Sequence, residues 1–266
     1  MRNMAAHSDK VQLEQLGFKF GMSGAHSARS MMITELNELL TLHPHGSPLQ
    51  TIKDDIIHCN VLHKSTANSR KLTYRHLVDL YSLKTDVCLY RNFLALWEQT
   101  DAQKRPILAL QLAFCRDPLL RLALPMLSSI SAGEPYSKEH TIELLEQHNP
   151  GGYSPSSLSS FAQNINGSLT QAGFLQGRTK KVRSQPSVGA SNVAFALFIA
   201  HLNGEDGSIA LKSQWVKLLG LNQDEIVAQA HNAHSRGLIK FTHAGEVVEI
   251  RFPNWLNEHE KEILNG

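Results

Sequence analysis

Apolar residues recur at steps of three and four along most of the chain, which predicts helices over much of its length. The pattern is clearest between Ser154 and Ala172, and Gly173 predicts the end of that helix, because glycine readily takes the left-handed conformation of a helix cap. Phe174 and Leu175 predict the first strand of a short hairpin, followed by a basic tip at residues 177–183. The apolar side of the helix is expected to consist of Leu158, Phe161, Ile165, Leu169 and Ala172.

The opposite side of this helix carries uncharged side chains that donate and accept hydrogen bonds, a composition that suits base edges and phosphate oxygens. No aspartate or glutamate occurs between Gln147 and Gly204, although the net charge of the whole chain is only +2. A basic hairpin without neighbouring acids attracts phosphate, so this stretch predicts a winged helix that contacts DNA. The same features also fit a merely solvated surface. The residues predicted to face DNA here are Ser156, Ser159, Gln163, Asn166, Arg178, Lys180, Lys181 and Arg183.

Helical patterns also predict a helix-turn-helix near the N-terminus. Ser27 is expected to cap a helix that runs to about Leu42, and a second helix is expected over residues 48–59. After the turn at residues 60–62, a polar and basic helix should reach Tyr81. An ordinary pair of helices with a solvated basic face is an equally good interpretation. If the pair binds DNA, its recognition residues are Lys64, Ser65, Thr66, Asn68, Arg70, Lys71 and Arg75.

Three apolar helices are predicted over residues 86–100, 103–115 and 117–130, with Pro125 expected to kink or split the third. They are too apolar to form a binding surface, so we expect them to be the packed centre of the protein. Ser137 is expected to cap a further helix that ends near His148, directly before the helix that begins at Ser154.

The C-terminal part repeats the pattern of helices followed by a hairpin. An apolar helix at residues 187–202 precedes a predicted strand at residues 208–211, two helices at residues 213–219 and 223–236, and a hairpin that turns at Ala244–Gly245. Acids lie at the start of the second helix, Asp224 and Glu225, and at the hairpin tip, Glu246. Because acids repel phosphate, this unit is expected to bind protein or to touch DNA only marginally.

The predicted fold class is therefore mainly α. A helical N-terminal bundle with a helix-turn-helix (residues 1–130) is followed by a winged helix with a basic wing (131–188) and a second, acidic winged helix (189–266). A length of 266 residues and an apolar content of 42% are sufficient for such packed units.

Composition narrows the function classes. No apolar run is long enough to span a bilayer, the three cysteines are widely spaced, and no secretory signal is recognisable, so a cytoplasmic protein without membrane contact is expected. The fourteen histidines show no metal-site spacing, and no phosphate-binding loop or nucleophile elbow occurs. We therefore expect no metal, no cofactor and no enzymatic activity.

Four segments resemble the BrxA family of BREX phage-defence systems: residues 60–66, 73–81, 116–121 and 169–175. The resemblance covers roughly residues 25–204. It implies a small, non-enzymatic protein of helices and a wing that binds DNA and is encoded among defence partners that include a methyltransferase and ATPases. Carried over to this chain, it places the DNA-facing residues at 64–75 and 156–183. Residues beyond 204 are not part of the resemblance.

These observations favour a DNA-binding accessory protein of a phage-defence system, with double-stranded DNA and other phage-defence proteins as its partners. Two alternatives stay open: a protein-interaction scaffold of a defence complex, and a winged-helix transcriptional regulator, which would need a dimer. The sequence leaves the oligomeric state undetermined.

Overall fold

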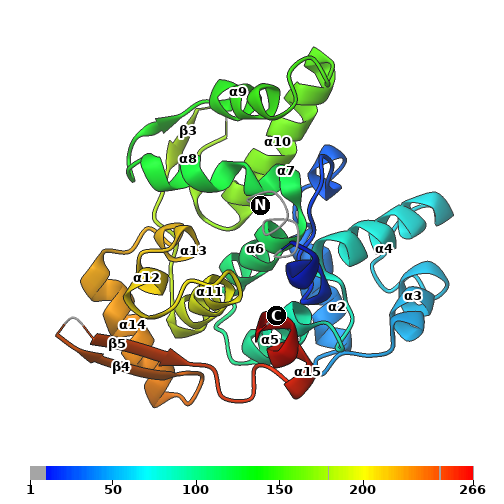
Figure 1. The fold of residues 1–266 in the computed structure, drawn as a ribbon. Helices are drawn as coiled ribbons and strands as arrows, with labels where there is room; N and C mark the ends of the chain where they lie inside the picture. Colours follow the sequence, from blue (N-terminus) through cyan, green and yellow to red (C-terminus); the bar gives the residue numbers. More distant parts are fainter. Residues whose placement is uncertain (1–9, 179, 246, 266) are drawn as a thin grey trace.

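A computed structural model describes residues 10–178, 180–245 and 247–265 of the chain. These residues form a mainly helical protein with one three-stranded and one two-stranded antiparallel sheet (Figure 1). The mainly α fold class predicted from the sequence is confirmed at this level.

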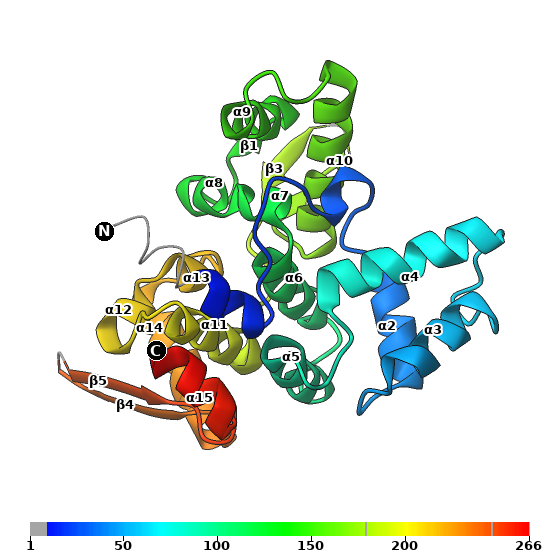
Figure 2. The same cartoon turned by 45° about the vertical axis from the view of Figure 1, so that its right-hand side comes forward.

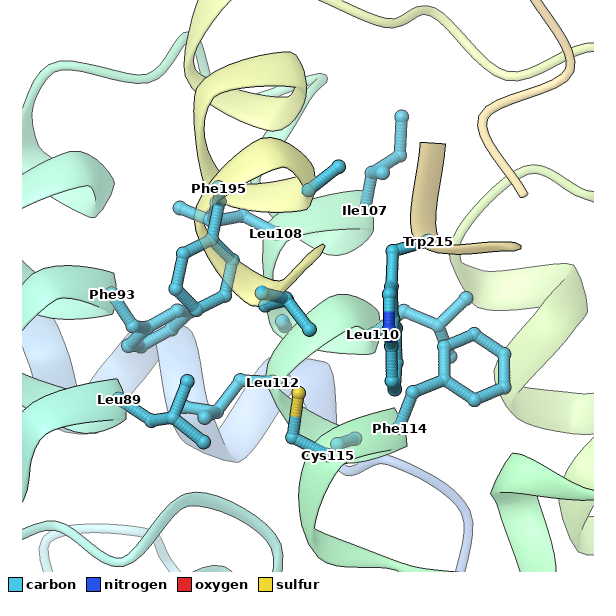
Figure 3. Close-up of a cluster of buried hydrophobic side chains, with 14 of the residues drawn as sticks. Leu89, Phe93, Ile107, Leu108, Leu110, Leu112, Phe114, Cys115, Phe195 and Trp215 are labelled. Carbon is cyan, nitrogen blue, oxygen red and sulfur yellow. The ribbon is translucent and has the colours of Figure 1, made fainter. Parts of the chain in front are cut away.

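Two apolar helices, α6 (Arg105–Arg116) and α11 (Ala190–Leu202), form the centre of the molecule. All side chains from Ile107 to Arg116 are buried, and α6 contacts α11 as well as helices of the N-terminal and middle parts of the chain. In Figure 3, Phe195 of α11 packs against Phe93, and Trp215 lies beside Leu110. Of the three apolar helices predicted to be the packed centre, the one at residues 103–115 is therefore central, and it shares that place with α11, which was not among the three.

The N-terminal helices are α2 (Ile33–Leu42), α3 (Leu49–Ile57), α4 (Ala67–Tyr81) and α5 (Cys88–Glu98). The predicted helix start at Ser27 is wrong. Residues 25–27 form only a short 3₁₀ helix, η1 (Ala25–Ser27), and α2 begins after Met32, which has a left-handed backbone with φ of 53°. The helix starts late because the backbone N–H groups of His26 and Met31 donate hydrogen bonds to Asp117 and Ser168, as described below.

The third apolar helix is split, as Pro125 predicts, into α7 (Pro118–Arg121) and α8 (Ala123–Ser129). Pro125 has no N–H to bond to the carbonyl four residues earlier, at Arg121, so a continuous helix would be interrupted there. Asp117 caps α7 by accepting hydrogen bonds from the backbone N–H groups of Leu119 and Leu120.

The middle unit, defined here as residues 135–183, combines two helices with the three-stranded sheet. Its elements follow the order β1 (Pro135–Tyr136), α9 (Lys138–His148), α10 (Pro155–Gln171), β2 (Leu175–Gln176) and β3 (Lys181–Arg183). Strand β3 lies between β1 and β2, with Tyr136 opposite Lys181 and Leu175 opposite Arg183. Strand β1 was not predicted, because two residues carry no alternation of apolar and polar positions.

The C-terminal unit, residues 207–251, consists of α12 (Gly207–Leu211), α13 (Gln214–Lys217), α14 (Gln223–Ser235) and the hairpin of β4 (Lys240–Ala244) and β5 (Val247–Arg251). The predicted hairpin is confirmed, but the strand predicted at residues 208–211 is wrong, since these residues are in α12. Ala210 and Leu211 are both buried while Ile209 is exposed, a pattern that fits a helix turn and breaks the alternation of a strand.

The last helix, α15 (Glu258–Asn265), returns to the N-terminal part of the chain. Arg91 of α5 forms an ion pair with the buried Glu260, and Asn92 donates to the carbonyl of Trp255. One continuous cluster of buried apolar side chains runs from Leu16 to Trp255 and so crosses both predicted domain boundaries. The three predicted domains stay a prediction.

Candidate nucleic-acid interface

A groove of about 920 Å³ opens between the N-terminal end of α9, the side of α10 and the connection between β2 and β3. Four cationic side chains line it, Lys138, Arg178, Lys180 and Lys181, together with a single acid, Glu139. Uncharged hydrogen-bonding residues of α10 form its floor. They are Gln163, Asn164 and Asn166. We call this surface the basic groove.

Local sequence signals explain why α10 forms beside the groove. The side chain of Ser154 accepts a hydrogen bond from the backbone N–H of Ser157, and Pro155 occupies the first helical turn, where a missing N–H has no cost. Gly173 follows the helix with φ of 81°, a left-handed conformation that glycine takes without strain. The predicted helix is therefore confirmed at both ends.

Two of the predicted contact residues on α10, Ser156 and Gln163, are exposed. Ser159 is half-buried and accepts a hydrogen bond from the Lys138 ammonium at 2.6 Å, so it fixes a cation of the groove. The serine oxygen is neutral, so this hydrogen bond does not pair the ammonium with a negative charge.

The prediction that Asn166 faces DNA is wrong. Its side chain is buried, and its amide oxygen accepts hydrogen bonds from the hydroxyls of Thr141 at 2.9 Å and Tyr136 at 3.2 Å. This network joins β1, α9 and α10. Burial raises the pKa of Tyr136 to about 12, partly offset by its hydrogen bond to Thr141, so the phenol stays a donor at neutral pH.

The cations of the β2–β3 hairpin divide into two groups. Arg178 and Lys180 are exposed, whereas Lys181 is half-buried and donates to the Thr170 hydroxyl at 2.8 Å and the Gly177 carbonyl at 3.1 Å. Among the described residues, none of these three cations pairs with a carboxylate. Their positive charge is therefore not neutralised by an ion pair.

The prediction that Arg183 contacts DNA is wrong, because only 3% of this residue is exposed. Its guanidinium lies 5.1 Å from the ring centre of Phe174 and donates to the carbonyls of Leu127, Phe174 and Ser184. Burial lowers the pKa of Arg183. Alternation along β3 cannot explain the error, because Lys181 and Arg183 are two residues apart and share a face of the strand. Arg183 is buried because its partners Leu127 and Phe174 come from other parts of the chain.

The predicted residues near α4 are also only partly available. Thr66 is the N-cap of α4 and exchanges hydrogen bonds with Ser69 in a capping box. The ammonium of Lys64 is paired with Glu35 of α2 at 2.8 Å, and Arg70 is half-buried. Exposed side chains remain at Ser65, Thr66, Asn68, Lys71 and Arg75.

The structure does not gather all predicted residues in one place. Those of α4 and those of the basic groove lie on different elements, and η1 contacts both α4 and α10 (Figure 2). The two sets are far apart along the chain, and nothing in the sequence predicts how one set is oriented relative to the other.

A buried polar cluster was missed by sequence reasoning. His26 donates a hydrogen bond through Nδ1 to the Asp117 carboxylate at 2.8 Å, and its Nε2 forms a hydrogen bond with the Ser168 hydroxyl at 2.7 Å. The backbone N–H of His26 also donates to Asp117, and that of Met31 donates to Ser168. Burial alone would raise the pKa of Asp117, but His26 and the backbone donors outweigh it and lower the pKa.

The order Asp117, His26, Ser168 matches the order of groups in a serine hydrolase relay, but the environment does not. Ser168 is fully buried, and its oxygen already binds the Met31 N–H, so no substrate carbonyl can approach it. The cluster instead connects η1 with α7 and α10. Its members are separated by 91 and 142 residues along the chain, so no local sequence signal could have identified it.

No family model, curated protein or solved structure matches this chain. In the described part of the chain, no helix has the length and apolar character needed to cross a bilayer. The same residues contain no cluster of three or more histidine, cysteine or acidic side chains placed to hold a metal ion.

Proposed function

We propose that this protein binds double-stranded DNA through the basic groove and the exposed side of α10. In this proposal the middle unit acts as a winged helix: α10 faces the major groove, and the β2–β3 hairpin grips the adjacent backbone as the wing. A helix of 17 residues is about 25 Å long, and the major groove of B-DNA is wide enough to admit it. Ser156 and Gln163 would then face base edges.

The observation that carries the proposal is the excess of positive charge in the groove, which four cations and a single acid line. Lys138 and Lys181 are held by neutral oxygen atoms, and Arg178 and Lys180 extend into solvent. Phosphate is the polyanion that such a surface attracts, and each neutralised phosphate releases a counterion. Arg183 and Asn166 are excluded from the contact because both are buried.

In the same proposal, α3 and α4 act as a helix-turn-helix that also touches the duplex. The exposed residues available to it are Ser65, Thr66, Asn68, Lys71 and Arg75. Lys64 is not among the proposed contacts, because its charge is neutralised by Glu35.

A titration of random-sequence duplex of about 30 base pairs, followed by fluorescence anisotropy across a salt series, tests DNA binding. We expect the logarithm of the association constant to fall linearly with the logarithm of the salt concentration, with a slope of about −0.9 per phosphate contact. The absence of binding at low salt would contradict the proposal.

We further propose, from the resemblance to the BrxA family, that the protein is a non-enzymatic accessory subunit that works beside other phage-defence proteins. Complementation of a deletion strain tests this role. Wild-type protein should restore a low plating efficiency of phage, and a variant with Lys180 and Lys181 changed to glutamate should not. Equal protection by both proteins would contradict a DNA-dependent role in defence.

A second candidate, a protein-interaction scaffold, is favoured by the C-terminal unit. Ile209 and Val247 are 63% and 69% exposed, and both line a groove between α12 and β5. Recovery of partner proteins after nuclease treatment, together with no DNA binding at low salt, would favour the scaffold over the DNA-binding protein.

A further inference from the structure

The segment of residues 28–31 lies between the two proposed DNA-binding elements. Figures 1 and 2 both show this blue segment between α10 and α4, directly after η1. It is held firmly on both sides. His26 binds Asp117 and Ser168, and the Met31 carbonyl accepts a hydrogen bond from Tyr81 at the end of α4.

Close packing also fixes the start of this segment. A side-chain carbon at Gly24 would lie 2.0 Å from the Asp117 carboxylate, so only glycine fits there. The Asn164 side chain of α10 donates to the carbonyl of His26 at 3.0 Å. Residues 24–31 therefore have one position relative to α10, set by buried contacts.

On the side of α10, the segment takes part in the basic groove. Ser30 lines the groove with Gln163 and Gly167, and its hydroxyl accepts a hydrogen bond from Gln171. A residue from the N-terminal part of the chain thus helps to line the groove.

On the side of α4, the segment adds a cation. Arg29 is exposed, and both Arg29 and Arg75 of α4 act electrostatically on His76. Burial lowers the pKa of His76 most, and the two arginines add to that effect, whereas Asp79 opposes it. Asp79 is itself paired with Lys19 at 2.9 Å, and no carboxylate in the described chain pairs with Arg29 or Arg75.

We propose that Arg29 contacts a DNA phosphate and joins the basic groove to α4, so that one duplex binds both surfaces together. This inference rests on the proposed DNA binding. Arg29 lies just after η1, which contacts both α10 and α4, and it precedes Ser30 in the lining of the basic groove, so its positive charge lies between the two proposed binding surfaces.

Salt-dependent anisotropy with the full chain tests this continuity. On a duplex of about 30 base pairs, Arg29→Gln and Arg75→Gln should each reduce the magnitude of the salt slope by about 1, because each removes one phosphate contact. Lys212→Gln, which removes an exposed cation of the C-terminal unit, is the matched control and should leave the slope unchanged. Circular dichroism checks that each variant folds; both arginines are exposed, so unchanged spectra are expected.

A shorter duplex separates the two surfaces. In the proposal, a duplex of about 10 base pairs fills the basic groove without also covering α4. Arg75→Gln should therefore have no effect on its binding, whereas changing Lys180 and Lys181 to glutamate should weaken it by about 100-fold. If the lysine variant binds far more weakly than the wild type, but Arg29→Gln and Arg75→Gln leave the slope unchanged on the long duplex, the inference is wrong and the proposed function stands. If wild-type protein binds neither duplex, both are wrong.

Discussion

The middle unit and the C-terminal unit share an order of elements but expose opposite chemistry. In each, a helix precedes a longer helix and a hairpin: α9, α10 and β2–β3 in the first, and α13, α14 and β4–β5 in the second. The longer helix begins with serines in α10, but with Asp224 and Glu225 in α14. The hairpin cations of the middle unit are unpaired by acids, whereas Arg251 of the C-terminal hairpin is paired with Glu249.

This difference shows that the backbone structure of each unit and the chemistry of its exposed surface have separate causes. Apolar spacing and caps determine where the helices and turns form, because burial and backbone hydrogen bonds dominate there. The residues left exposed determine which partner can approach. Glu225 completes a capping box with Asn222, so one of the acids of α14 already has a structural role. Glu246, the acid predicted at the hairpin tip, is outside the described residues.

Charge reversal in the two hairpins should give the largest difference in DNA affinity between the two units. Changing Lys180 and Lys181 to glutamate should weaken DNA binding by about 100-fold at moderate salt, because two phosphate contacts are lost and repulsion is added. Lys240→Glu in β4 changes an equally exposed lysine of the other hairpin and should alter the affinity less than about twofold. Similar losses from both hairpins in an anisotropy titration would show that the two units do not differ in DNA binding.

The buried arginine of the middle hairpin should contribute to the stability of the fold, whereas its exposed neighbours should not. Arg183→Ala should lower the free energy of unfolding by about 2–3 kcal/mol, because buried carbonyls of Leu127 and Phe174 lose their donor. Arg178→Ala should change it by less than about 0.5 kcal/mol, since that side chain is exposed. Urea denaturation compares the two. Equal free energies of unfolding for the two variants would contradict a structural role for Arg183.

The sequence predicted elements whose signals are local. Ser154 and Gly173 bracket α10, and Pro125 marks the break before α8, because a cap or a missing N–H acts within a few residues. The turn of the C-terminal hairpin at Ala244–Gly245 is likewise a local signal.

The sequence could not predict the burial of side chains whose partners are distant along the chain. Arg183 and Asn166 have the composition of contact residues, yet Phe174, Leu127, Tyr136 and Thr141 surround them in the folded chain. For the same reason the helix predicted from Ser27 does not start there. The cluster of His26 with Asp117 and Ser168 offers more buried hydrogen bonds than the first turn of an exposed helix.

Substitutions of two neighbouring amide side chains on α10 should separate effects on stability from effects on DNA binding. Asn166→Ala should lower the free energy of unfolding by about 1–2 kcal/mol, because the Tyr136 and Thr141 hydroxyls lose a buried acceptor. Gln163→Ala should leave stability within about 0.5 kcal/mol and weaken DNA binding about three- to tenfold, because its exposed side chain would face a base edge. Denaturation and anisotropy measured on both variants test the division. A Gln163 variant with wild-type affinity would remove this position from the proposed contact surface.

The smallest expected effect concerns two carboxyl groups whose pKa values shift in opposite directions. The pKa of Asp117, beside the middle unit, is lowered, so its contribution to stability is present above the ordinary pKa of 3.8 and is lost as the pH falls through the lower, folded value. The pKa of Glu205, before the C-terminal unit, is raised by burial despite the opposing charge of Lys217. The unfolded chain therefore ionises at Glu205 at a lower pH than the folded chain does, and stability falls as the pH rises from 4.5 through the folded value.

Glu205→Gln removes that titration, so the melting temperature of the variant at pH 7 should exceed that of the wild type by less than about 2 °C, with the difference disappearing near pH 4. Thermal melts at a series of pH values measure this difference. A variant that is less stable than the wild type at pH 7 would mean that the ionised Glu205 carboxylate is stabilised by contacts that outweigh its burial, and the two units would then respond to pH with the same sign.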